Sequence, residues 1–253
     1  GPRDKGPQAT SKHITFRYNI LAEALDYATH IKGKHSKGAL VHDFSQHVAF
    51  IGNLFAHNAR RNPYFKAHTT GVVLNNIIYN ADANAVKLGF IDTEWAHTAF
   101  NPKNPQVAVI GNVLRYGRDS YSDLALVSYH GDAYLQDNLT FNLDDKAMYD
   151  TAGVITPLAV APVWPKGVRV MAAKEVEHQL LPVVGARYWQ RDLTDQRIVQ
   201  SYVDRNGRII DSQQQVGGYP QIKPLYRPLQ VPTDNINAWL DSFIPAGNKQ
   251  QEP

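Results

Sequence analysis

The sequence predicts an all-β protein built as a right-handed parallel β-helix, a solenoid, with a C-terminal tail that contains short helices. Two observations carry this prediction. Apolar segments punctuated by asparagine recur through the first 140 residues or so, at intervals that suit solenoid coils with loops of varying length. After about residue 150 the pattern gives way to proline-rich and helix-like segments. We therefore assign residues 1–155 to β-helix coils and residues 156–253 to a C-terminal extension that packs along the solenoid.

Each repeat has an apolar strand, then asparagine, then a second, shorter apolar strand. The repeats are residues 13–21, 48–55, 72–79, 107–114 and 133–141, and their asparagines are Asn19, Asn53, Asn76, Asn112 and Asn138. Asparagine tolerates a left-handed backbone at a tight corner, and its amide can bond to the coils above and below. The alternative is an antiparallel sandwich of five hairpins. It is disfavoured because hairpin turns usually carry Asn-Gly or Asp-Gly.

The extension contains several local signals. Residues 156–170 are rich in proline and apolar residues and are predicted to be a surface loop. Helices are predicted over residues 172–181, 191–202 and 235–243, with Asp192 or Thr194 as the cap of the second. Residues from 248 onward form a polar tail that we expect to be disordered.

Composition limits the class of protein. The 253 residues carry a formal net charge of +3 and no cysteine, which excludes disulfides and thiolate metal sites. We expect a secreted or periplasmic bacterial protein, although a cytosolic protein could have the same composition. Lys and Arg are not dense enough for a nucleic-acid binder, and no apolar stretch approaches the ~18 residues of a membrane span. The sequence therefore predicts neither a nucleic-acid nor a membrane partner.

Two basic clusters follow asparagine corners of neighbouring coils. The first spans residues 30–38 and the second residues 57–66. Because coils stack about 4.8 Å apart, we expect the two clusters to meet in one cationic groove that suits a polyanionic chain. The alternative is a solvated basic surface without a role. The candidate ligand-binding residues are Lys34, His35, Lys37, His57, Arg60, Arg61, Tyr64 and Lys66.

Other chemistries find less support. The histidines are numerous, but no pair has the helical spacing of a His-Glu-x-x-His zinc site. Asp144–Asp145 and Asp192 with Asp195 are paired acids that could serve a glycoside hydrolase. Both pairs are more readily explained as structural, one in a corner loop and one in the extension.

The second cluster resembles the signature of polysaccharide lyase family 1, the pectate lyases. That signature is an apolar strand, Asn, a short strand and then Arg-x-Pro-x-x-Arg, and here it reads from Asn53 through Arg61-Asn62-Pro63 to Lys66. Residues 36–41 resemble the coil that carries a substrate-binding Lys, for which Lys37 is the best match and Lys34 the second. The resemblance covers residues 13–80 and again 184–220, where the chain is similar to the C-terminal segment of bacterial secreted lyase-like proteins.

The resemblance implies a role for each residue of the motif. Arg61 corresponds to the catalytic base, and Lys66 stands where the family has a second Arg that holds a substrate carboxylate. Lys keeps the charge but not the bidentate geometry. The resemblance also implies a calcium cofactor. The family's acidic calcium ligands lie on earlier coils, so we expect them before residue 1, in a missing N-terminal segment, and no metal ligand can be named in this sequence.

The sequence thus predicts a lyase that cleaves an acidic polysaccharide or oligosaccharide, foremost pectate, by calcium-assisted β-elimination. Two alternatives stay open. One is a glycoside hydrolase on the same solenoid, and the other is a non-catalytic glycan-binding β-helix.

Overall fold

The computed structural model describes residues 2–220 and 228–243. Residues 1–218 form one compact unit, and residues 219–253 form a second, whose described part contains α4 (Ile236–Asp241). The polar tail predicted from residue 248 lies outside the described residues. Within the described ranges, no helix is long and apolar enough to cross a membrane.

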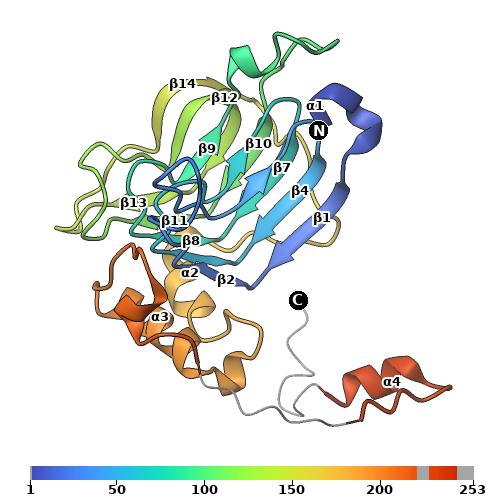
Figure 1. Ribbon diagram of the computed structural model, residues 1–253, viewed down its shortest axis with the longest axis vertical. Coiled ribbons are helices and arrows are strands. Elements are labelled where there is room, and N and C mark those ends of the chain that lie inside the picture. The colour runs from blue at the N-terminus through green and yellow to red at the C-terminus, as the bar shows by residue number, and fades with distance from the viewer. Residues whose placement is uncertain (1, 221–227, 244–253) are drawn as a thin grey trace. The chain divides into compact units, whose positions relative to one another are not determined.

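The named strands of the first unit run parallel to their neighbours and stack in successive coils with three faces (Figure 1). Face 1 consists of β1 (Lys12–Arg17), β4 (Gln46–Ile51), β7 (Thr70–Leu74), β10 (Gln106–Ile110) and the second half of β12 (Val127–Gln136). Face 2 consists of β2 (Ile20–Ala22), β5 (Leu54–Ala56), β8 (Ile77–Tyr79), β11 (Val113–Arg115) and β13 (Leu139–Phe141). Face 3 consists of β3 (Leu40–Val41), β6 (Tyr64–Phe65), β9 (Val86–Leu88), the first half of β12 and β14 (Thr151–Pro157).

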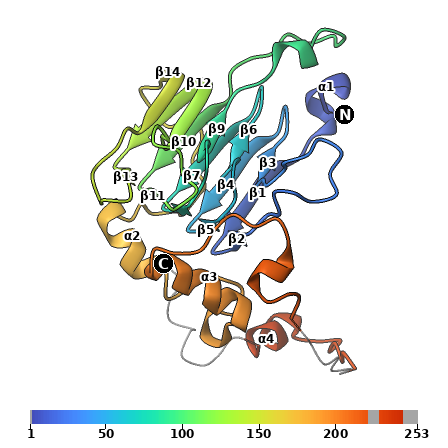
Figure 2. The same ribbon diagram turned by 60° about the vertical axis from the view of Figure 1, so that its left-hand side comes forward.

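Strand β12 joins two of these faces. Its first residues, Val127–Tyr129, pair with β9, and its last, Asp132–Gln136, pair with β10. Figure 2, turned by 60° from Figure 1, shows β3 and β6, which are not labelled in Figure 1. The predicted parallel β-helix is thus confirmed as a stack of parallel sheets. The all-β label is too narrow, because helices pack onto the strands.

The asparagines form a continuous ladder at the corner between faces 1 and 2. Asn53 donates from its backbone N and from Nδ2 to Oδ1 of Asn76, at 2.8 and 2.9 Å. Asn76 makes the same pair of bonds to Asn112, and Asn112 to Asn138. From Asn53 to Asn138, each Nδ2 also donates to a backbone carbonyl of the preceding coil, as Asn76 donates to Phe50 O at 2.9 Å. The predicted coil-to-coil amide bonds are therefore confirmed.

The reason given for asparagine at the corner needs correction. Positive φ angles occur one residue before each ladder asparagine, at Tyr18 (56°), Gly52 (61°), Asn75 (52°), Gly111 (62°) and Asp137 (49°). The left-handed turn therefore belongs to the preceding residue, and the asparagine contributes its side-chain hydrogen bonds. Gly111 also permits close packing, since a Cβ there would lie 2.3 Å from Asn75 Nδ2.

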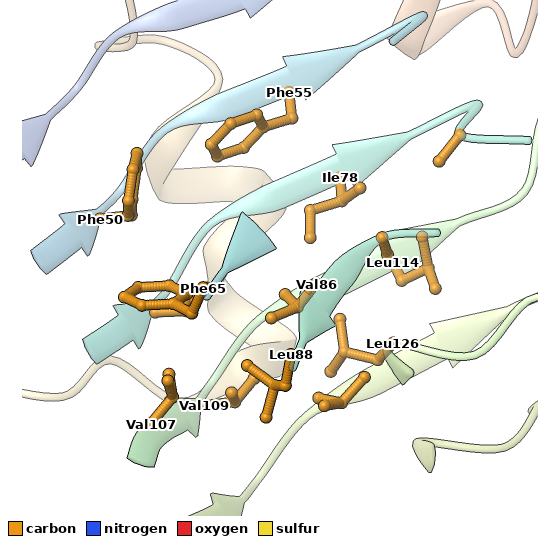
Figure 3. Close-up of a cluster of buried hydrophobic side chains, with 14 of the residues drawn as sticks. Phe50, Phe55, Phe65, Ile78, Val86, Leu88, Val107, Val109, Leu114 and Leu126 are labelled. Atoms are coloured by element: carbon orange, nitrogen blue, oxygen red, sulfur yellow. The ribbon is translucent and has the colours of Figure 1, made fainter. Parts of the chain in front are cut away.

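The interior of the coils is an apolar core to which all three faces contribute (Figure 3). Phe50 and Val109 come from face 1, Phe55 from face 2, and Phe65 and Leu88 from face 3. Phe50 and Phe65 meet edge to face with ring centroids 6.1 Å apart. Burial of each such side chain contributes roughly 1.5–3 kcal/mol, which holds the three faces together without disulfides.

The helices of the extension cover face 2. Helix α2 (Ala173–Leu180) and helix α3 (Leu193–Val203) pack Val176, Leu180 and Tyr202 against outward residues such as Ile77. These helices confirm two of the three predicted in the extension, and Asp192 caps α3 by accepting from Asp195 N. The third predicted helix is the shorter α4.

The segment after β14 crosses face 1 as a loop. It is tied at its start by Leu158 N, which donates to Ala133 O at 2.9 Å, and at its end by Met171 N, which donates to Asn75 Oδ1 at 2.9 Å. Val163 and Val168 pack on the outward side of β4 and β7. The predicted surface loop is confirmed, with the difference that β14 extends two residues into it.

Candidate functional site: a cationic patch on face 3

The outward side of face 3 carries a row of side chains in register. Tyr64 of β6 lies beside Lys87 of β9, while their neighbours Phe65 and Leu88 point into the core. The Lys87 Nζ atom lies 5.1 Å from the ring centroid of Tyr64 and 4.2 Å from that of Tyr129 in β12. Strand alternation therefore places Lys87 beside Tyr64, whereas Tyr129, which is in register with Leu88, reaches the same side through its φ of 88°.

The loops that lead into β3 and β6 bring further cations to the same place. Lys37 and Arg60 form a parallel bridge between adjacent coils, and Ala39 N donates to Arg61 O at 2.7 Å. The Arg61 guanidinium lies 5.5 Å from the centroid of Tyr64. The predicted meeting of two basic clusters thus takes place at these residues. We call Lys37, Arg60, Arg61 and Lys87, with Tyr64 and Tyr129, the cationic patch.

The cations of the patch repel one another and outnumber the ion pairs that they make. Burial and the charges of Arg60 and Arg61 lower the pKa of Lys37. Burial, followed by Arg61 and Arg60, likewise lowers the pKa of Lys87. Within the described residues, only Arg60 of the four cations has an ion pair, with Asp82 at 3.4 Å. Because its positive charges are poorly compensated, the patch favours an anionic ligand.

Arg61 combines burial with an unusual backbone. Its φ is 65°, in the left-handed region that non-glycine residues seldom adopt. Gly38 of the adjacent coil allows this, since a Cβ there would lie 2.6 Å from Arg61 O. Burial lowers the pKa of Arg61, and Arg60 lowers it further, whereas Tyr64 and Glu94 act in the opposite direction.

The remaining residues of the first cluster lie at the edge of the patch. Lys34 is exposed, pairs with Asp26 at 3.5 Å and lies 5.0 Å from the ring centroid of Tyr27. His35 stacks on His30 with ring centroids 3.8 Å apart. Burial lowers the pKa of His35, and the charges of His30, Lys37 and Arg61 add to this effect. The structure thus brings His35 close to the patch, while Lys34 is engaged outside it.

Three predicted substrate contacts do not fit their positions. Lys66 is 5% exposed, and its ammonium bonds to Glu94 and lies 3.6 Å from Asp43, so its charge is compensated by two acids of the protein. His57 is buried between β5 and the extension, where Nε2 meets Ser201 Oγ at 2.8 Å. Tyr64 is 5% exposed, so its ring supports the cations, whereas Tyr129 at 39% can stack on a ligand.

The two acid pairs noted in the sequence lie outside the cationic patch. Asp145 pairs with Arg115 at 2.5 Å and Asp192 caps α3, which confirms that both acid pairs include structural residues. No group of three or more His, Asp or Glu residues among residues 2–220 and 228–243 could hold a metal ion. Calcium therefore does not fit the cationic patch itself, and ligands before residue 1 remain a prediction.

Lys87 and Tyr129 belong to the patch but were not predicted from the sequence. A usable signal exists for Lys87, which alternates with the apolar residues Val86 and Leu88. It also follows Tyr64 by the same interval of 23 that separates Asn53 from Asn76. Tyr129 gives no such signal, because its outward position depends on a φ of 88° in the middle of β12.

No protein-family model matches the sequence, and no curated protein matches it. One similar solved structure is that of the thermostable pectate lyase PL 47, with 13% sequence identity and a TM-score of 0.46. The match covers 70% of this chain and 52% of that one, so the chain spans about half the length of that lyase.

Proposed function

We propose that the protein binds an acidic polysaccharide on the cationic patch and cleaves it by β-elimination, with pectate as the foremost substrate. One observation carries this proposal. Lys37, Arg61 and Lys87 are gathered at one place without an ion-pair partner among the described residues, next to the exposed ring of Tyr129. Carboxylates supply the missing charge, and the aromatic ring supplies a surface for a sugar.

The chemistry follows from the position of Arg61. A neutral Arg61 takes the proton from C5 of a uronic acid residue, the C4–O bond breaks, a C4–C5 double bond forms, and the leaving oxygen takes a proton from water. Lys37 and Lys87 hold the carboxylate on C5 and stabilise the charge that develops beside it. Arg61 must lose a proton first, and its burial beside Arg60 favours this step.

The test separates binding from chemistry. Polygalacturonate is incubated with the protein at alkaline pH, with calcium and with chelator, and the absorbance of the unsaturated product is followed. Arg61→Ala is expected to lower this rate at least about a hundredfold, as general-base catalysis typically contributes ~10²–10⁴. Lys37→Gln is expected to weaken binding, and Lys34→Gln serves as the matched control because its cation lies outside the patch.

Each alternative outcome has a definite meaning. Full activity of Arg61→Ala would remove Arg61 as the base. Retention of the protein on a polyuronate column without unsaturated product would instead identify a non-catalytic glycan-binding protein. Saturated products would identify a hydrolase.

A further inference from the structure

A hollow lies on face 1, on a different side of the coils from the cationic patch. Its volume is about 250 Å³. Its lining includes Ala49 and Val72 from the sheet, His13 of β1 and His47 of β4, and Trp164 and Lys166 of the crossing loop. No residue of this pocket takes part in the proposed elimination.

Small side chains create the pocket. Thr15, Ala49 and Val72 follow one another in register across β1, β4 and β7. The crossing loop packs Val163 and Val168 over the outward residues of β4 and β7. Thr15 and Ala49 fill little of the space between sheet and loop, so a hollow stays open at the β1 end of the sheet.

The polar groups of the pocket are available to a ligand. The rings of His13 and His47 stack with centroids 4.6 Å apart, and neither imidazole has a hydrogen-bond partner among the described residues. Lys166 likewise has no ion pair there. Trp164 donates its indole N–H to Val168 O at 3.2 Å, which holds the ring, and it is 41% exposed.

We propose that this pocket binds one acidic sugar ring, as a second site for the polysaccharide that the cationic patch binds. The identity of the sugar rests on the proposed function, whereas the existence of the pocket does not depend on it. Drug-sized ligands fill pockets of roughly 300–1,000 Å³, so this one suits a single ring. Trp164 stacks on the ring, His13 and His47 bond its hydroxyls, and Lys166 pairs with its carboxylate. Two binding sites on one protein raise its apparent affinity for long polysaccharides over short ones.

The test uses trigalacturonate as the ligand and observes each site separately. Histidine ring signals in NMR spectra, assigned with His13→Gln and His47→Gln, report the pocket. Trp164→Ala is expected to weaken binding at these signals about tenfold and to leave turnover of short oligosaccharides unchanged. Trp189→Ala is the matched control, since Trp189 is similarly exposed at 46% and does not line the pocket.

The outcomes distinguish this inference from the proposed function. Unchanged His13 and His47 signals at saturating trigalacturonate would overturn the pocket while leaving the patch intact. Equal effects of Trp164→Ala and Trp189→Ala would also overturn it, as would equal affinity for a neutral trisaccharide. Persistence of the histidine shifts in a Lys37→Gln/Arg61→Ala double variant that no longer cleaves would show the pocket acting independently of the patch.

Discussion

Removal of the central rung of the asparagine ladder should destabilise the protein severely. The side chain of Asn76 is fully buried and makes four hydrogen bonds. It donates to Phe50 O at 2.9 Å and to Asn112 Oδ1 at 3.0 Å, and it accepts from Asn53 N at 2.8 Å and from Asn53 Nδ2 at 2.9 Å. At about 1 kcal/mol net for each bond, Asn76→Ala should lower the free energy of unfolding by ~4 kcal/mol.

Asn19 provides the matched control at the end of the ladder. Its exposed side chain makes two hydrogen bonds, to Arg17 O at 3.1 Å and to Asn53 Oδ1 at 3.0 Å. Because water can replace these partners, Asn19→Ala should cost ~1 kcal/mol or less. Urea unfolding of both variants, followed by far-ultraviolet circular dichroism, gives the comparison. If Asn76→Ala loses no more stability than Asn19→Ala, the ladder does not stabilise the coils.

Three further predictions concern charged residues. Burial opposes ionisation of Glu177, but hydrogen bonds from Arg115 and Tyr202 hold its pKa at about 2. The stabilisation that the ionised carboxylate provides is fully present above the usual pKa of 4.5 and is lost as the pH falls to about 2. Glu177→Gln should therefore lower the free energy of unfolding, measured by urea titration, by of order 2 kcal/mol at pH 7 and by much less at pH 2. Lys66→Met should lower the free energy of unfolding by ~3 kcal/mol, because it leaves the buried Asp43 carboxylate with less compensating charge. The affinity for uronate should not change, and an affinity loss in a stable variant would contradict this. Lys87→Met should raise the melting temperature and weaken uronate binding, since it relieves repulsion in the patch; a lower melting temperature would refute the repulsion.

Much of the fold could be predicted because its repeat is local in sequence. The order of strand, Asn and strand in the segments around Asn53 and Asn112 is visible without any structure, and it fixes the corner between faces 1 and 2. Strands β3 and β6 have two residues each, too few for a period to be recognised, so face 3 was not visible in the sequence. The second half of β12 falls in the predicted repeat 133–141, but its first half was missed, since the strand turns from one face to the next near Gly131 without an asparagine.

The site was predicted in part, and the errors have a structural cause. Lys37, Arg60 and Arg61 lie together because they precede face 3 strands of adjacent coils, which follows from the repeat. Lys66 carries the same charge and follows β6 directly, yet it turns inward to Glu94. Its partner belongs to a loop 28 residues away, and no spacing rule connects the two positions.

The three faces differ in what covers their outward side, and this difference favours face 3 as the ligand-binding face. Helices α2 and α3 pack on face 2 through residues such as Val176 and Tyr202, and the crossing loop packs on face 1 through Val163. On the outward side of face 3, the Lys87 side chain lies over the rings of Tyr64 and Tyr129 and near other cations. A half-buried group of like charges destabilises the free protein. A bound polyanion compensates that cost, so the same repulsion that weakens the fold strengthens the affinity for an acidic chain.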